Sequence, residues 1–147
     1  MTILDKIIAD KRKEVALKKA IIPVAQLEAS VFFDRQTKSL SNNLRNGSRG
    51  IIAEHKRRSP SKSVINNDFS VEEVIKAYEN AGAMGISVLT DMKYFGGALD
   101  DLVLARASTT IPLLRKEFII DEYQILEAKA YGADVILLIA SVLTRKE

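Results

Sequence analysis

Cysteine is absent from this chain of 147 residues, and histidine occurs only once, at position 55. The lack of cysteine excludes a disulfide framework, a thiolate zinc site and a cysteine nucleophile. A metal site built from several histidines is excluded as well. Long apolar runs are also missing, because the longest uncharged one near the end, residues 135–144, is about half the ~20 residues that a membrane-spanning helix needs. We therefore expect neither a metal centre nor a membrane protein.

The composition is that of an ordinary globular domain, with 47% hydrophobic and 28% charged residues. Lysine and arginine number 22 against 19 aspartate and glutamate residues, which gives a net charge of +3. This mild excess falls short of a nucleic-acid-binding domain and suits small anionic ligands at least as well. Acidic side chains lie among the first lysines, which fits neither a secretory signal nor a transit peptide, so we expect a cytoplasmic protein.

The pattern of the chain changes at about residue 50. Between residues 3 and 17, apolar side chains recur mostly at the spacing of an amphipathic helix. Residues 36–49 are polar and rich in serine, asparagine and glycine, which is typical of a connector. We therefore expect a helical extension and connector over residues 1–49, followed by the main domain over residues 50–147.

The main domain alternates short apolar runs with helical segments. The runs lack clean polar alternation, which favours strands buried on both faces, and they cover residues 50–54, 85–90, 111–115 and 133–140. Capping residues predict two helices between them, one from Ser70 to Gly82 and one from Asp121 to Gly132. A third helix is expected over residues 99–107. This order calls for a parallel sheet with right-handed crossovers.

The spacing of these units is typical of a (β/α)8 barrel. Successive strands start about 28 residues apart on average, so eight units would need well over ~200 residues, near the ~250 of a closed barrel. The main domain holds only four units. We therefore expect an α/β half-barrel of about four βα units, preceded by an extra N-terminal helix.

The end of the first strand is the most informative segment, because Glu54 and Lys56 are followed there by three further cations. Alternation along a strand sends the Glu54 and Lys56 side chains to the same side and His55 to the other. Ligands of parallel β/α folds bind at such carboxyl ends. A solvated basic loop with a structural Glu–Lys pair fits the spacing equally well. A nucleic-acid patch fits it less well, because no aromatic residue is interleaved.

A second candidate is Lys116, which ends another apolar strand. The strand ends of a barrel converge on one mouth, so Lys116 and Lys56 are placed to face one ligand. The alternative is two surface lysines with solvated ammonium groups. Residues 90–98 combine Tyr94 and Phe95 with two glycines, which predicts either a mobile loop over a planar substrate or a plain turn. This segment lacks the spacing of the glycine-rich phosphate motifs.

Four long motifs follow one another along the chain. They are IIAEHKRRSPSK at residues 51–62, ISVLTDMKYFGG at 86–97, IPLLRKEFIIDEYQ at 111–124 and EAKAYGADVILLI at 127–139. Together they resemble the indole-3-glycerol phosphate synthase family, and the resemblance extends to the N-terminal helix. It implies a (β/α)8 barrel and a decarboxylating lyase of tryptophan biosynthesis. The implied substrate is a small phosphorylated molecule, 1-(2-carboxyphenylamino)-1-deoxyribulose 5-phosphate. The implied reaction converts it to indole-3-glycerol phosphate without a metal or an organic cofactor.

The resemblance also implies catalytic roles for three residues. Lys116 is similar to the general acid that protonates the ketone oxygen of the substrate during ring closure. Lys56 is similar to a second catalytic lysine, which binds a substrate anion and assists proton transfer, and Glu54 is its partner. The chemistry is reasonable on its own terms, because ring closure at a carbonyl needs a proton donor.

Three further residues are implied in substrate binding: Ser59 as a contact to a substrate anion, and Phe95 and Phe118 as walls of the pocket for the anthranilate ring. The sequence departs from the usual family pattern at three positions. His55 stands where an apolar or aromatic residue is usual, Ser63 where glycine is common, and Ala98 where serine is common.

The resemblance ends after the fourth βα unit. The family continues through four more, which bring a further catalytic glutamate, an asparagine and the phosphate site. We therefore expect a truncated form or a deliberate half-barrel that is inactive alone and self-associates through its exposed strand edges. The alternative is a half-barrel without catalysis, which binds an anionic ligand or assembles with a partner.

Overall fold

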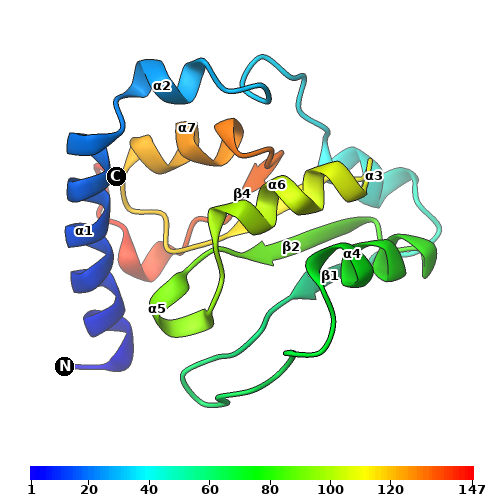
Figure 1. Cartoon of the computed structure of the whole chain (residues 1–147), viewed down its shortest axis with the longest axis horizontal. Coiled ribbons are helices and arrows are strands. Elements are labelled where there is room, and N and C mark those ends of the chain that lie inside the picture. Colours follow the sequence, from blue (N-terminus) through cyan, green and yellow to red (C-terminus); the bar gives the residue numbers. More distant parts are fainter.

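The computed structural model describes all 147 residues and contains one parallel sheet (Figure 1). Its four strands lie in the order β1-β2-β3-β4, so each pairs with the next along the chain. The strands are β1 (Ile52–His55), β2 (Gly85–Leu89), β3 (Leu113–Lys116) and β4 (Val135–Ile136). The predicted parallel sheet is confirmed. The fourth strand is shorter than expected, because β4 pairs with β3 alone and the chain turns into a 3-10 helix (Ala140–Val142).

The chain also contains seven α-helices. They are α1 (Ile3–Ile21), α2 (Val24–Glu28), α3 (Leu40–Asn46), α4 (Val71–Asn80), α5 (Met92–Phe95), α6 (Leu99–Ser108) and α7 (Glu122–Ala130). The four helices expected from the sequence are α1, α4, α6 and α7. None of the helices is both long enough and apolar enough to cross a lipid bilayer.

The ends of α4 and α7 follow the predicted chemistry. Ser70 and Glu73 form a capping box at the start of α4, and Asp121 and Gln124 form another at the start of α7. Just after the C-terminal ends of these helices, Gly82 and Gly132 adopt φ angles of 90° and 97°, which other residues rarely tolerate. The two helices therefore stop where the sequence predicts and lead directly into β2 and β4.

The stretch 36–49, expected as a connector, contains the helix α3. Ser39 caps it by accepting a hydrogen bond from the backbone N–H of Asn42. The side-chain amide of Asn43 donates to the carbonyl of Met84 just before β2. These contacts hold a short polar segment in helical form against the amino-terminal end of the sheet. The local sequence did not predict this helix.

Helices α4, α6 and α7 cover one face of the sheet. The buried cluster between them contains Val71, Ile75, Ile86, Val88, Leu102, Ala105, Leu113, Ala128 and Ala133. Each large apolar side chain of this kind contributes roughly 1.5–3 kcal/mol on burial. The opposite face has no helix over it, and Ile52 is 43% exposed there. A parallel sheet with helices on one face only is the arrangement of half a (β/α)8 barrel.

The register defines which side chains share the uncovered face. Glu54 pairs with Ser87, Ser87 with Leu114, and Leu89 with Lys116. Paired residues in a parallel ladder point to the same side, so Glu54 and Lys116 both lie on the face that would line the barrel interior. Arg115 and His55 point to the helix side.

At the amino-terminal end of the sheet, Asp134 holds several segments together. Its side chain is fully buried and pairs with Arg35 at 2.5 Å and with Arg106 at 2.7 Å. The backbone N–H groups of Leu113 and Lys38 donate to it as well. Burial would raise the pKa of Asp134, but these hydrogen bonds and charges lower it below the usual value. The interactions at this end of the sheet therefore stabilise the fold, as is usual in barrels.

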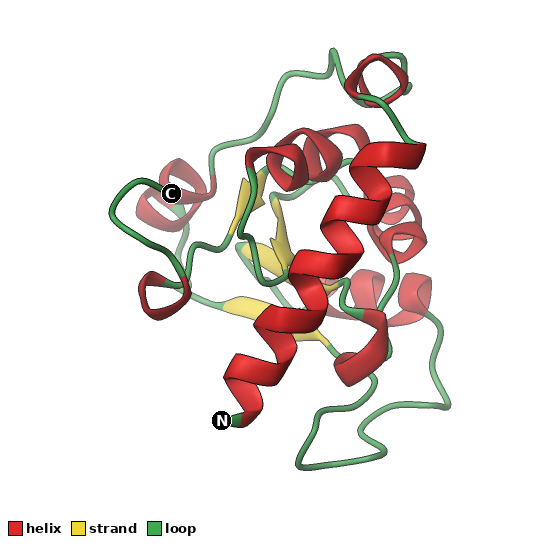
Figure 2. Cartoon of the chain, turned by 90° about the vertical axis from the view of Figure 1, so that its left-hand side faces the viewer, coloured by secondary structure: helices red, strands yellow, loops and turns green.

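Helix α1 crosses the opposite end of the sheet, in front of the strands in Figure 2. Its buried side chains are Ile7, Lys11 and Val15, one turn apart. Val15 packs into a second apolar cluster with Leu27 of α2 and with Tyr123 of α7. The N-terminal extension is therefore attached to the carboxyl ends of the strands, where sites in this architecture lie.

Candidate active site

Glu54, in β1, lies between the two lysines that the sequence singles out. Its Oε1 atom is 3.2 Å from Nζ of Lys56, and its Oε2 atom is 3.4 Å from Nζ of Lys116. Lys56 follows β1 directly, whereas Lys116 is the last residue of β3, two strands away. The carboxyl ends of β1 and β3 thus bring the three predicted catalytic residues into one cluster.

The cluster is open to solvent, because each of its three side chains is between 32% and 42% exposed. Ion pairs with this degree of exposure contribute only about 0–1 kcal/mol each. An anionic ligand can therefore replace Glu54 as the partner of either ammonium group at little cost. The carboxylate meanwhile keeps two positive charges close together while the site is empty.

An aromatic pair lies beside this cluster. Phe95 ends α5 and Phe118 follows β3, and their ring centroids are 6.1 Å apart at an interplanar angle of 41°. Both rings are half-buried. Phe118 is two residues beyond Lys116, so the rings form an apolar wall close to an ammonium group. Such a wall suits a planar aromatic ligand.

Ser59, predicted as an anion contact, forms hydrogen bonds only within its own loop. Its hydroxyl accepts a hydrogen bond from the backbone N–H of Lys62 at 3.2 Å, within a tight turn of the loop that follows β1. It has no hydrogen bond to Lys56 or Lys116. Its predicted contact with a substrate anion stays a prediction.

Two of the cations that follow β1 have structural partners. Arg57 binds both carboxylate oxygens of Asp101, at the start of α6, and also donates to the carbonyl of Gly96. Arg58 donates to the carbonyls of Met92 and Lys93 in α5. These two arginines are therefore bound to protein groups and are not part of a solvated basic loop, and they fix the loop against the segment that carries Phe95.

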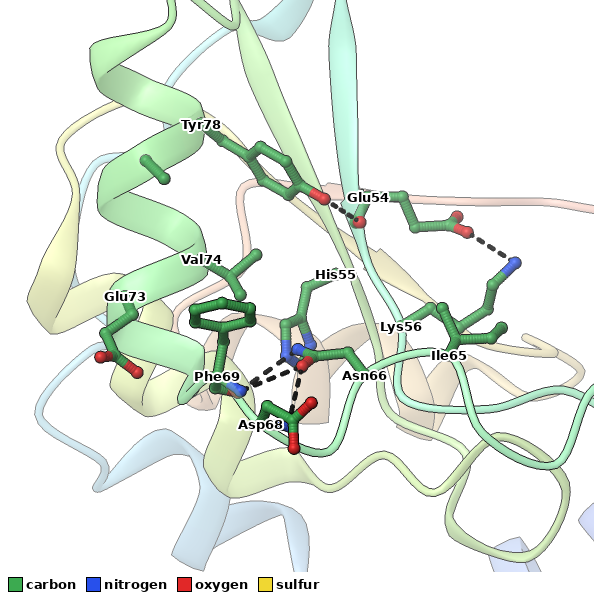
Figure 3. A pocket seen from close by; sticks show the side chains of 11 residues that line it. Glu54, His55, Lys56, Ile65, Asn66, Asp68, Phe69, Glu73, Val74 and Tyr78 are labelled. Atoms are coloured by element: carbon green, nitrogen blue, oxygen red, sulfur yellow. Dashed lines mark hydrogen bonds and ion pairs between the residues drawn. The ribbon is translucent and has the colours of Figure 1, made fainter.

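A cavity of about 630 Å³ adjoins the cluster at the outer edge of β1 (Figure 3). It is lined by β1, by residues 65–69 and by α4, from which Tyr78 donates a hydrogen bond to the carbonyl of Glu54 at 2.8 Å. His55 also lines it and, as predicted, points away from the ion pairs of Glu54. Lys116, Phe95 and Phe118 are not among its lining residues. The cavity therefore shares Glu54 and Lys56 with the predicted site but does not reach Lys116 or the two phenylalanine rings.

Comparison with known proteins gives a consistent result. The sequence profile of the family described as indole-3-glycerol phosphate synthase matches residues 4–147. An indole-3-glycerol phosphate synthase of Bacteroides thetaiotaomicron is 46% identical, over 99% of this chain and 56% of its own length. Those of Dechloromonas aromatica and Neisseria meningitidis serogroup B are each 44% identical, over 99% of this chain and 57% of their own lengths.

The chain belongs to the indole-3-glycerol phosphate synthase family. This family consists of decarboxylating lyases with a (β/α)8 barrel, and the four-stranded sheet corresponds to half of that barrel. The chain spans about half the length of the curated relatives it matches. The uncovered sheet face, with Glu54 and Lys116 on it, is then the face that lines the interior of an indole-3-glycerol phosphate synthase barrel.

Lys11 lies just behind this site and was not predicted from the sequence. Lys11 of α1 is 2% exposed, and its ammonium contacts Asp91 after β2 and Glu117 after β3. A signal was present, because Lys11 falls at helical spacing between Ile7 and Val15, in the middle of the apolar stripe. A cation at such a position must have buried partners, but the sequence does not say which.

Proposed function

We propose that this chain supplies catalytic and binding groups of an indole-3-glycerol phosphate synthase. The substrate is 1-(2-carboxyphenylamino)-1-deoxyribulose 5-phosphate, and the products are indole-3-glycerol phosphate, carbon dioxide and water. The observation that carries the proposal is the position of Glu54 between Lys56 and Lys116, at the carboxyl ends of two strands and beside an aromatic pair.

In this proposal, Lys116 is the general acid. A carbon–carbon bond forms between the carboxylate-bearing ring carbon and the ketone carbon of the substrate, and the ammonium of Lys116 protonates the oxygen that becomes a hydroxyl. Carbon dioxide then leaves from the ring carbon, and water leaves with the former ketone oxygen. A donor placed at the developing negative charge accelerates such a step by about 10²–10⁴-fold.

Lys56 binds a substrate anion and assists proton transfer, and Glu54 orients both lysines before the substrate arrives. Phe95 and Phe118 hold the anthranilate ring, and their contact across two loops supports this role. Ser59 adds a contact to a substrate anion once its turn is released from the N–H of Lys62. No metal or organic cofactor takes part, and the substrate is a small phosphorylated molecule rather than a nucleic acid.

The proposal includes the organisation and location of the protein. Residues 1–49 form a helical extension with its connector, and residues 50–147 form the first half of the barrel. The family's role in biosynthesis supports a cytoplasmic location. Copies of the half-barrel associate through the edges of β1 and β4, which have no neighbouring strand in this chain.

The test uses a barrel in which residues 1–147 are fused to the second half of the Bacteroides thetaiotaomicron relative. Lys116→Met removes the ammonium and keeps an unbranched stem, so we expect turnover to fall by about 10²–10⁴-fold with little change in KM. Lys56→Met should also raise KM, because an ammonium in an anion site stabilises the bound substrate. Formation of indole-3-glycerol phosphate is followed by its fluorescence.

Lys76→Met is the matched control, because Lys76 lies on the exposed surface of α4 and pairs only with Glu72. Lys76→Met should leave turnover within about twofold of the parent barrel, because an exposed ion pair contributes little free energy. The assignment of Lys116 would be wrong if Lys116→Met kept turnover within about threefold of the parent, far below the general-acid effect.

A further inference from the structure

We propose that Lys11 is a positioning residue for ring closure, and that its ammonium fixes the ends of β2 and β3 so that Lys116, Phe95 and Phe118 face the substrate. The inference rests on the proposed function above. It assigns an active-site task to the N-terminal extension, through a residue that does not itself touch the substrate.

The contacts of Lys11 join three elements. Its Nζ atom is 2.9 Å from Oδ1 of Asp91, 3.2 Å from Oε1 of Glu117 and 2.8 Å from Oε2 of Glu14. The Asp91 and Glu117 side chains are only 4% and 1% exposed. One buried ammonium from α1 therefore stands between two buried carboxylates at the ends of neighbouring strands.

Asp91 carries the effect of Lys11 to the aromatic ring of Phe95. Its second oxygen, Oδ2, accepts a hydrogen bond from the backbone N–H of Tyr94 at 2.8 Å and so caps α5, the short helix that ends in Phe95. A helix of four residues does not persist without such support. The phenol group of Tyr94 also donates to Asp10 of α1, at 2.5 Å. Helix α1 thus holds α5 at two points.

Glu117 carries the effect to the other side of the site. It lies between Lys116 and Phe118 in the chain, and its Oε1 atom accepts a hydrogen bond from the backbone N–H of Phe118 at 2.9 Å. Its Oε2 atom accepts from the hydroxyl of Thr90 at 2.9 Å, which ties the end of β3 to the end of β2. The carboxylate that Lys11 binds therefore fixes the backbone N–H of Phe118 and the hydroxyl of Thr90.

The charge of Lys11 stabilises this arrangement, together with the buried guanidinium of Arg115, which is 3.7 Å from Oε2 of Glu117. Burial alone would lower the pKa of Lys11, but the charge of Glu117 and the hydrogen bonds to Glu14 and Asp91 raise it above its usual value. The residue is thus cationic throughout the working pH range. Without the ammonium, the carboxylates of Asp91 and Glu117 would repel each other in a region shielded from water, and the two strand ends would move apart.

A small displacement is enough to affect the reaction. A misplacement of about 1 Å of a catalytic group costs up to about 10²-fold in rate. In the fused barrel, we therefore expect Lys11→Met to lower kcat by about 10–100-fold, whereas Lys11→Arg, which keeps the charge, should recover most of that loss. Lys18→Met is the matched control on the same helix, because Lys18 pairs with Glu14 and Glu127 and contacts neither strand end.

A second measurement separates positioning from simple stabilisation. If Lys11 acts through Lys116, the effect of Lys11→Met on kcat should shrink to less than about threefold when Lys116 is already Met, because residues that act as a unit are not additive. All assays are run well below the melting temperature of each variant. Effects on kcat that multiply in the double variant, or an unchanged kcat in Lys11→Met, would overturn the inference.

The outcomes distinguish this inference from the proposed function. A large effect of Lys116→Met with none of Lys11→Met leaves the function intact and refutes the positioning role, while no effect of Lys116→Met refutes the function itself. If Lys11→Met does not fold, the same assays are made on Lys11→Met/Glu117→Gln, which removes one charge of each sign. Failure of both variants to fold would assign Lys11 a structural role only and so overturn the inference.

Discussion

Among single residues, His55 stands out because its buried ring has an Nε2 atom without a hydrogen-bond partner. Burial lowers the pKa of His55, the positive charge of Arg57 lowers it further, and Asp101 acts in the opposite direction. The folded protein therefore favours the neutral form of His55 more than the unfolded chain does.

The lowered pKa of His55 predicts a pH-dependent stability. The unfolded chain takes up a proton on His55 at about pH 6.5, whereas the folded chain does so only at lower pH. The stabilising contribution is therefore complete above about pH 6.5 and is lost as the pH falls through the folded-state pKa, by at most about 1.4 kcal/mol per pH unit. We expect His55→Phe to flatten the decline in free energy of unfolding between pH 7.5 and 5.5, as measured by urea denaturation. Equal slopes in both proteins would refute this prediction.

The active-site residues differ in how far the sequence predicts them. The alternation of a strand predicts that Glu54 and Lys56 meet, and the convergence of strand ends predicts that Lys116 joins them. Lys11 was not predicted, because its partners Asp91 and Glu117 come from the ends of two other strands. A buried ion pair between distant segments is set by packing, and no local pattern specifies it.

At the scale of secondary structure, the helices whose bounds were predicted most closely are those that carry their own start and stop signals. Helices α4 and α7 have capping boxes and glycine ends, and both were predicted closely. Helices α3 and α5 were not, because segments of seven and four residues are too short to persist without tertiary contacts. The contacts that hold them come from Met84 and from α1, and neither is visible in the local sequence.

The capping box of α4 gives a prediction at this scale. Ser70→Ala removes the side-chain oxygen that accepts from the N–H of Glu73, so we expect the free energy of unfolding to fall by about 1 kcal/mol. Ser108→Ala is the matched control, because its hydroxyl donates only to the carbonyl of Leu104 inside α6. It should change stability by no more than about 0.5 kcal/mol. Equal losses in the two variants would show that the cap contributes nothing specific.

For the molecule as a whole, the uncovered sheet face and the free edges of β1 and β4 are the dominant features. Ile51 and Ile52 at the first strand and Leu138 after the last are between 43% and 57% exposed. Unpaired strand edges beside exposed apolar side chains favour association. In the Bacteroides thetaiotaomicron relative, 44% of the length has no counterpart in this chain, because the match covers 56% of it.

We therefore expect a polypeptide of residues 1–147 alone to form dimers or larger species and to lack measurable synthase activity. Light scattering at concentrations on the order of tens of micromolar measures the first, and a fluorescence assay for indole-3-glycerol phosphate measures the second. Addition of the second half of a relative in trans should reduce this association and restore synthase activity. A monodisperse monomer would contradict the expected association, and turnover above background would contradict the expected inactivity.

The docking of α1 against the strand ends has a consequence for the order in which the protein is made. Lys19 near the end of α1 and its partner Asp121 are 102 residues apart in the chain, and Lys11 and Glu117 are separated by about as many. At the usual speed of translation, roughly 5–20 s pass between the synthesis of α1 and that of its partners. During this interval Val15 has Leu27 but lacks Tyr123 and Ala130, and Lys11 has only Glu14. Helix α1 therefore leaves the ribosome well before the segments that hold it, and it is among the last elements to reach its place.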